Sequence, residues 1–190
     1  MSYRISWFLA ACLAILCGAP LVAAPAEVPL KNPSFEEGVD QRGTPLGWQR
    51  YGGGGQGQRL SVVDVPGGGK ALLIEDGDPN AEIGITQTAP ARPEEVYRAS
   101  VRVGRVAGAD AAGAYLQLRF LPSQKFVQVA LMPGEGMAFR EVSATMQAPA
   151  GTTGLMLYLY THKAPTPKVI VDDVKVESGV ELPADAVIPE

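Results

Sequence analysis

Apolar and polar side chains alternate with a period of two along much of this chain. The segments YRASVRV at 97–103, YLQLRFL at 115–121, FVQVAL at 126–131 and LMLYLY at 155–160 each place an apolar residue at every second position. Successive side chains of a β-strand point to opposite faces, so this period is typical of strands with one buried face. Further strands are predicted at 59–65, 70–76, 82–88, 139–147 and 168–177.

The segments between the predicted strands are rich in glycine, proline and aspartate, as in PGGGK, EDGDPN and APAGTTG. Such residues favour turns, and no window shows the period of a long amphipathic helix. Nine or ten short strands joined by turns predict an all-β protein, an antiparallel β-sandwich of the jelly-roll kind.

The first 26 residues have the plan of a secretory signal peptide. Arg4 precedes an apolar stretch at 5–18, and small residues with Ala24 and Ala26 at the positions of an A-x-A cleavage site follow. The apolar stretch is shorter than the roughly 20 residues of a spanning helix. We expect cleavage after Ala26 and export to the periplasm or the extracellular space. Acylation at Cys12, in the lipobox-like LAAC, is the alternative.

The composition of the remaining chain excludes several classes of function. Both cysteines lie in the leader, so the mature chain has no thiol for catalysis, metal binding or a disulfide. Loss of Arg4 with the leader changes the net charge from −4 to −5, and such a chain has no broad attraction to nucleic acid. After signal removal no membrane span is expected. We predict one jelly-roll domain at 27–177 and a loose tail at 178–190.

Six motifs follow one another in a characteristic order: NPSFEEG at 32–38, GTPLGW at 43–48, KALLIE at 70–75, ITQTAPARPEEVYRASVRV at 85–103, FREVSATMQAPAG at 139–151 and VIVDDVKVE at 169–177. In order and spacing they resemble the carbohydrate-binding modules of the 4/9/22 type from bacterial cellulases and xylanases. The resemblance covers residues 30–177. It implies a galactose-binding-like jelly roll, which agrees with the alternation, and a polysaccharide or glycan as partner.

The last predicted strand carries an unusual aspartate. Strict alternation places Asp172 on one face with Ile170, Val174 and Val176, so its carboxylate would point inward. A buried carboxylate is costly unless it is paired, hydrogen-bonded or bound to a metal.

The resemblance implies that this aspartate binds a structural calcium ion that ties the first and last strands together. It implies the side chains of Glu36 and Asp172 as ligands, with main-chain oxygens of Ser34 and Lys70. Calcium prefers oxygen ligands of this type. In the alternative interpretation, Glu36 and Asp172 cap turns or pair with Lys70 or an arginine.

The outward positions of three predicted strands hold the side chains that sugars require. Aromatic rings stack on pyranose faces, and planar polar groups hydrogen-bond to hydroxyls. These positions hold Tyr115, Gln117, Arg119, Phe126, Gln128, Tyr158, Tyr160 and His162. If the strands share one sheet, these residues form an aromatic and polar platform. Alternatively, Tyr158 and Tyr160 belong to a second small core, an arrangement that Met156 in the same row would suit.

The sequence supplies little for enzyme chemistry. His162 is the single histidine, there is no G-x-S-x-G motif, and adjacent acids such as Glu36 and Glu37 point to opposite faces of a strand. Trp48, the one tryptophan after the leader, stands in a motif that the family uses for packing. We therefore expect an exported, non-catalytic carbohydrate-binding module with a structural calcium ion. The alternative is a structural or protein-interaction module of the cell envelope on the same fold.

Overall fold

The computed structural model describes residues 24–66, 68–134 and 138–184, which form eleven strands and no helix. The strands are β1 (Ala26–Glu27), β2 (Gln49–Gly52), β3 (Arg59–Asp64), β4 (Lys70–Glu75), β5 (Ile83–Pro90), β6 (Val96–Arg105), β7 (Ala114–Leu121), β8 (Phe126–Ala130), β9 (Arg140–Gln147), β10 (Gly154–Thr161) and β11 (Lys168–Ser178). The predicted signal peptide falls outside the described residues up to position 23, and the predicted tail does so from position 185. Both stay predictions.

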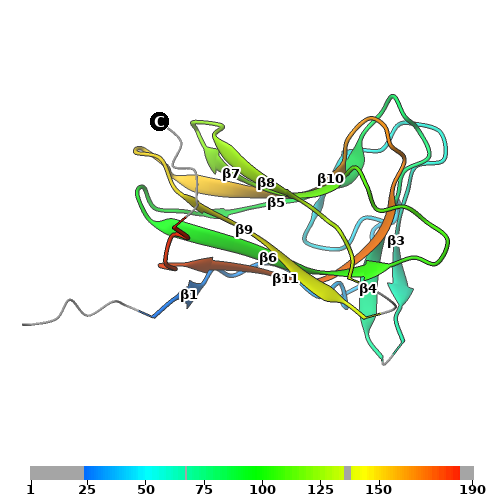
Figure 1. Cartoon of the computed structure of the whole chain (residues 1–190), viewed down its shortest axis with the longest axis horizontal. Helices are drawn as coiled ribbons and strands as arrows, with labels where there is room; N and C mark the ends of the chain where they lie inside the picture. Colours follow the sequence, from blue (N-terminus) through cyan, green and yellow to red (C-terminus); the bar gives the residue numbers. More distant parts are fainter. Residues whose placement is uncertain (1–23, 67, 135–137, 185–190) are drawn as a thin grey trace, which may run out of the picture.

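Two antiparallel sheets face each other across the core (Figure 1). The upper sheet of Figure 1 has the order β2-β5-β10-β7-β8, and the lower sheet has the order β3-β4-β11-β6-β9, with β1 added to β11. Sequence neighbours therefore often lie in different sheets, as the crossing connections of a jelly roll require. The predicted all-β antiparallel sandwich is confirmed.

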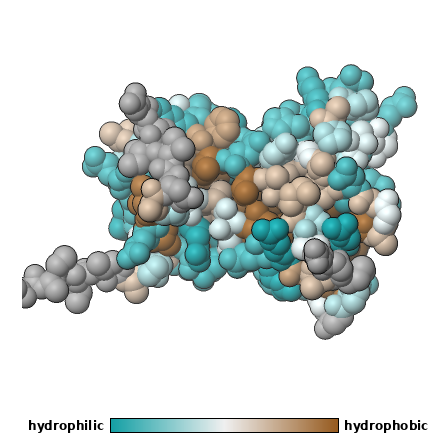
Figure 2. All heavy atoms as spheres, in the orientation of Figure 1, coloured by the Kyte–Doolittle hydropathy of each residue, from teal (hydrophilic) through white to brown (hydrophobic). Residues whose placement is uncertain are grey.

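The alternating residues form the core between the sheets. Leu116, Leu118 and Phe120 of β7 are fully buried, as are Leu157 of β10 and Val101 of β6. Figure 2 shows apolar residues gathered along the middle of the view, between hydrophilic regions above and below. Burial of these side chains contributes about 1.5–3 kcal/mol each and is the main stabilising term in a chain without a disulfide among its described residues.

The last strand departs from strict alternation. A β-bulge interrupts the pairing of β11 with β6: Asp172 lies opposite Arg102 but Lys175 lies opposite Ser100, which leaves one extra residue, Asp173, with a φ of +48°. Val169 and Val171 are fully buried before the bulge, and Val174 and Val176 are buried after it. Asp172 is buried as predicted, but the prediction that it shares a face with Val174 and Val176 is wrong, because a period of two does not continue across a bulge.

The segment between β1 and β2 closes one side of the sandwich. Its Lys31 amide donates to Gln87 Oε1 of the upper sheet at 2.7 Å, and its Pro33 carbonyl accepts the Val174 amide of the lower sheet at 2.9 Å. Phe35 is fully buried, and its ring centroid lies 5.8 Å from that of Trp48. Trp48 is 7% exposed, so its predicted packing role agrees with the structure.

Candidate functional site

The strand register arranges the outer face of the upper sheet in rows. One row runs from Tyr51 on β2 through Gly84 on β5 and Tyr160 on β10 to Tyr115 on β7. The next row contains Gln49, Thr86, Tyr158, Gln117 and Gln128. A third row contains Thr88, Met156, Arg119 and Phe126. Strands distant in sequence thus bring aromatic, amide and guanidinium groups onto one surface.

These rows surround a pocket of about 340 Å³. It is lined by Tyr51, Glu82, Gln117, Arg119, Phe126, Gln128, Tyr158, Tyr160 and His162. The list includes all but one of the residues predicted to bind a ligand. The exception is Tyr115, which lies beside the pocket, with its ring 4.8 Å from that of His162 and 6.1 Å from that of Tyr160.

The floor of the pocket depends on a glycine. A Cβ atom added at Gly84 would lie 2.5 Å from Tyr160 Cβ, so the small residue allows β5 and β10 to approach here. The Tyr51 ring from the edge strand packs edge-on against Tyr158 at 5.3 Å and against Tyr160 at 5.7 Å between centroids. Edge-to-face packing of this kind is favourable for aromatic quadrupoles.

A hydrogen-bond network fixes the polar side chains of the pocket. Gln117 Nε2 donates to Gln128 Oε1 at 3.0 Å and to the Tyr160 hydroxyl at 3.2 Å. The Tyr160 hydroxyl donates to Gln128 Oε1 at 2.7 Å and lies 3.2 Å from His162 Nε2. Burial raises the pKa of Tyr160 above its ordinary value. The phenol therefore stays protonated at neutral pH and serves as a donor.

Arg119 lies between two aromatic rings. Its guanidinium carbon is 5.3 Å from the Phe126 centroid and 5.0 Å from the Tyr158 centroid. Its Nε donates to Gln117 Oε1 at 2.9 Å, and its Nη1 donates to Gln124 Oε1 at 3.3 Å. Cation–π contacts and amide hydrogen bonds thus hold the guanidinium in one orientation.

Glu82 brings a carboxylate to the pocket from the start of β5. The Tyr51 hydroxyl donates to Glu82 Oε2 at 2.6 Å, and His162 Nδ1 lies 3.6 Å from Glu82 Oε1. The hydrogen bond to Glu82, with burial, raises the pKa of Tyr51 to about 12. Tyr51 therefore keeps its proton and donates a hydrogen bond to Glu82 over the whole physiological pH range.

The exposure of the rings bears on the alternative of a second core. Phe126 is 51% exposed, and Tyr158 and Tyr115 are half-buried, whereas Tyr160 is 5% exposed. Tyr160 is buried by its neighbours in the rows, so it forms the base of the pocket. The other rings keep surface that a ligand can contact.

Tyr51 and Glu82 were missed by reasoning from the sequence. Tyr51 belongs to a strand of four residues that runs into the glycine-rich segment 52–55, and so short a segment gives no readable alternation. Glu82 directly precedes β5, and nothing in the sequence distinguishes it from the other acids. The aromatic Tyr51 before a run of glycines was the one available signal.

Of the residues predicted to bind calcium, Glu36 contacts Lys70 and lies near enough to Asp172 for its charge to act on that carboxyl. Asp172 is 9% exposed, and the one hydrogen bond of its carboxylate to the described residues comes from the Asp173 amide at 2.8 Å. Burial raises the pKa of Asp172, and the nearby charges of Asp173 and Glu36 contribute. Glu36 Oε1 accepts the Lys70 amide at 2.6 Å, a contact that the turn-capping alternative also contains. Ser34 is half-buried two residues before Glu36.

A buried carboxylate with a single donor, beside a second carboxylate, fits the oxygen set that a calcium ion takes. In the described part of the chain, no group of three or more His, Cys, Asp and Glu side chains is placed to hold a metal. The candidate site has two carboxylates and would draw its other ligands from main-chain oxygens.

Within the described residues, no helix is long and apolar enough to cross a membrane.

The sequence matches no protein-family model and no curated protein, but the fold matches solved structures. A Stig cyclase, Fisc, from Fischerella sp. TAU shares 15% identity at a TM-score of 0.58, over 82% of this chain and 98% of that chain. The enzymatically active domain of bacteriophage CBA120 tailspike protein 4 shares 14% identity at a TM-score of 0.56, over 78% of this chain and 21% of that chain.

A third similar structure comes from Clostridium thermocellum. It contains the CBM22-1 and GH10 modules of xylanase 10B complexed with xylohexaose, and it shares 19% identity at a TM-score of 0.50, over 86% of this chain and 30% of that chain. This chain therefore spans about a fifth of the tailspike structure and less than a third of the xylanase structure. At such identities the likeness is one of fold, and it agrees with the predicted jelly-roll sandwich, which one of these structures shares through a carbohydrate-binding module.

Proposed function

We propose that this protein is an exported, non-catalytic carbohydrate-binding module that holds a glycan in the pocket of the upper sheet. The observation that carries this proposal is the composition of that pocket. Aromatic rings of Tyr51, Phe126 and Tyr158 stand beside amide groups of Gln117 and Gln128 in a hollow of about 340 Å³. Its size suits one or two sugar units.

The chemistry of the pocket suits a pyranose better than an apolar ligand. The C–H groups of a sugar face pack on an aromatic ring, while hydroxyls at the ring edge need donors and acceptors. Phe126 offers an exposed ring, and Glu82 and the two glutamines offer acceptors and donors within the same hollow. Because the network already fixes these groups, little conformational entropy is lost when a ligand binds.

The proposal excludes catalysis because the pocket lacks a second acid. Glu82 is the one carboxylate among its lining residues. Hydrolysis of a glycosidic bond generally requires two carboxyl groups that flank the bond. Some proteins of this fold are enzymes, so we expect purified protein to bind glycans without releasing shorter products.

We further propose that calcium binds at Glu36 and Asp172 and stabilises the fold. The support is the buried Asp172 carboxylate, its raised pKa and the proximity of Glu36. A bound divalent cation would neutralise both carboxylates and tie the segment at 32–38 to β11. Export, suggested by the leader at 1–26, would give access to calcium at extracytoplasmic concentrations.

The test is retention by polysaccharides in affinity gels, preceded by a glycan array. Tyr158→Ala should weaken binding about tenfold, because a stacked ring contributes roughly 0.5–1.5 kcal/mol beyond its buried area. Arg98→Ala on the lower sheet is the matched control and should leave retention unchanged. If the wild type binds no glycan on the array or in gels, the module for protein interaction in the envelope replaces this proposal.

A further inference from the structure

We propose that the glycan held in the upper-sheet pocket is acidic, and that Arg119 receives its carboxylate. This inference rests on the proposed function, and it names the class of sugar. The geometry of Arg119 and the placement of the surrounding charges carry it.

Arg119 is fixed but has no acidic partner. Its described hydrogen bonds go to the neutral amide oxygens of Gln117 and Gln124, and they use Nε and one hydrogen of Nη1. No carboxylate of the described residues lies at ion-pair distance from it, whereas Arg98 and Arg102 on the lower sheet each contact a carboxylate at 2.6 Å. A partly buried guanidinium usually pairs with an anion, so the pocket leaves a place for one.

The two rings beside Arg119 decide which part of it a ligand can reach. The ring centroids of Phe126 and Tyr158 lie 5.3 Å and 5.0 Å from the guanidinium carbon, so the two rings cover part of the guanidinium. Nη2 donates no hydrogen bond to the described residues, and Nη1 donates one, so donors on both Nη atoms are left to pair with a ligand. This fork matches the two oxygens of a carboxylate, which it binds through two charge-assisted hydrogen bonds.

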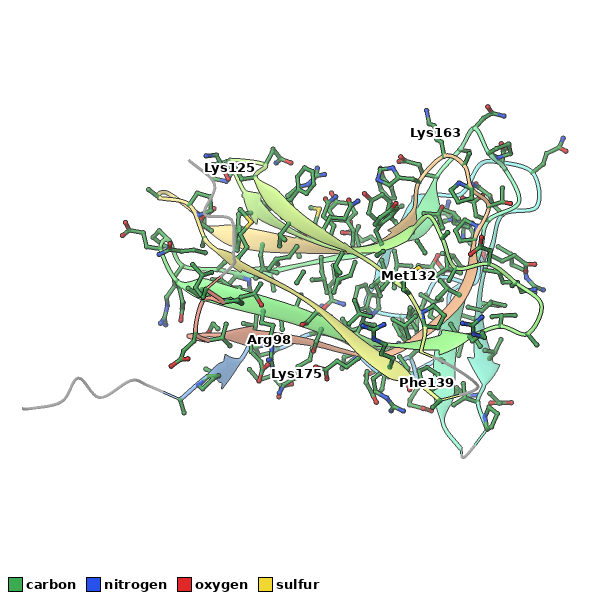
Figure 3. The ribbon with its side chains drawn as sticks, in the orientation of Figure 1. Arg98, Lys125, Met132, Phe139, Lys163 and Lys175 are labelled. Atoms are coloured by element: carbon green, nitrogen blue, oxygen red, sulfur yellow. The ribbon has the colours of Figure 1, made fainter. Side chains whose placement is uncertain are left out.

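Two lysines add positive charge around the pocket. Figure 3 shows Lys125 and Lys163 on the upper part of the molecule, on either side of the upper face. Each is adjacent in sequence to a lining residue, Phe126 or His162, and neither forms an ion pair with another described residue. The whole chain has a net charge of −4, whereas the residues at these two positions beside the lining are cationic.

The negative charge of Glu82 does not cancel the positive charge of Arg119, because the Glu82 carboxylate already has partners. Tyr51 donates to one oxygen at 2.6 Å, and His162 lies 3.6 Å from the other. Burial raises the pKa of Tyr160 most, Glu82 raises it further, and Arg119 lowers it, which indicates that Tyr160 senses both charges. The pocket is therefore bipolar: an anion fits beside Arg119, and hydroxyl donors fit beside Glu82.

A uronic acid unit has the matching distribution of groups. Its carboxylate lies at the edge of the pyranose ring, while hydroxyls occupy the opposite edge. With one sugar face on Phe126 or Tyr158, the carboxylate can meet the Arg119 fork and the hydroxyls can reach Glu82 and Gln128. A neutral hexose would leave the guanidinium without a counter-ion in a partly desolvated site.

The test compares acidic polymers with neutral forms of the same backbone. Polygalacturonate, alginate and glucuronoxylan are each paired with their carboxyl-reduced products in affinity gels. We expect the wild type to bind at least one acidic polymer roughly tenfold more tightly than its reduced form, in line with a charge-assisted bidentate contact. Arg119→Gln should remove this preference, and Arg102→Gln on the lower sheet should retain it.

Three outcomes overturn the inference. Equal or tighter binding to the reduced polymers shows a neutral-sugar site and leaves the proposed function intact. An acid preference that survives in Arg119→Gln, with unchanged melting temperature, assigns the carboxylate to another residue. If neither acidic nor neutral polymers bind, the proposed function fails together with this inference.

Discussion

The outer faces of the two sheets are built on the same pleat but use their polar residues differently. On the lower sheet, charged side chains pair with one another: Arg98 and Lys175 contact Glu177 at 2.6 Å and 2.7 Å, and Arg102 contacts Asp173 at 2.6 Å. Figure 3 shows Arg98 and Lys175 on this lower side. On the upper sheet, amides, phenols and a single guanidinium surround a hollow.

This difference gives the two outer faces of one sandwich different polar surfaces. On the lower sheet several charges are paired with one another; Lys175 and Arg98, for example, lower the pKa of Glu177. On the upper sheet the polar groups of the pocket form hydrogen bonds with one another. Arg119 contacts two aromatic rings there in place of a carboxylate. Donors, acceptors and ring surface of the upper sheet line the pocket and can contact a ligand.

The largest effect should come from adding one methyl group to the floor of the pocket. Gly84→Ala would place a Cβ atom 2.5 Å from Tyr160 Cβ and push β5 away from β10. We expect a loss of about 1–3 kcal/mol in the free energy of unfolding, as for overpacked cores, and a matching loss of glycan binding. Thermal and denaturant melting measure the first quantity.

Gly54→Ala is the control for this substitution, because nothing lies within 4 Å of a Cβ atom added there. If the two variants have the same melting temperature, the close approach of β5 and β10 does not shape the pocket. The hollow of the upper sheet then does not depend on Gly84.

A smaller effect is expected at the bulge on the other sheet. Burial raises the pKa of Asp172 above its ordinary 3.8 in the folded state. This carboxyl therefore stabilises the fold fully below its unfolded pKa and loses that contribution as pH rises through the folded pKa. Asp172→Asn removes the titration and, without metal at neutral pH, should raise the melting temperature by about 2–4 °C, the shift for roughly 1 kcal/mol.

With calcium present, the wild type should melt at a higher temperature than Asp172→Asn. The wild type gains stability as calcium binds the folded state, while the variant shows no response. Melting curves with EDTA and with added calcium, at neutral pH and near pH 4, provide the comparison. Should Asp172→Asn melt lower than the wild type in EDTA, Asp172 is a structural hydrogen-bond acceptor and the calcium proposal falls.

The smallest effect belongs to the ion pairs of the lower sheet. Both members of the Arg102–Asp173 pair are about half exposed, so water and salt screen their attraction. Arg102→Gln should change the free energy of unfolding by less than about 1 kcal/mol and leave glycan binding unchanged. A loss of binding in this variant would mean that the lower face also takes part in recognition.

Much of the sandwich follows from the sequence because alternation reports directly which face of a strand is buried. All nine predicted strands exist, and Tyr97, Leu116 and Leu157 lie in the core as expected. Two features escaped. The bulge at Asp173 inserts one residue into the pattern, and nothing local distinguishes VDDV from a regular strand. The four-residue β2 is defined by pairing with β5, which is a long-range property.

The composition of the pocket was predictable in part for the same reason. Outward residues of β7, β8 and β10 could be read off the alternation, but their adjacency depends on strand order. Tyr51 and Glu82 join them through β2 and the start of β5. Tyr115 was predicted in the pocket and lies beside it, between Tyr160 and Ala130 in its row.

The position of β2 has a consequence for how the pocket opens. This strand supplies Tyr51, yet it is four residues long, lies at the edge of its sheet and pairs with β5 alone. Detaching it breaks one short ladder and leaves the ten-residue β6 and the rest of the core in place. We therefore expect the amides at 49–52 to exchange with solvent by local opening, without unfolding of the sandwich, and a bound ligand to slow this exchange most at these residues.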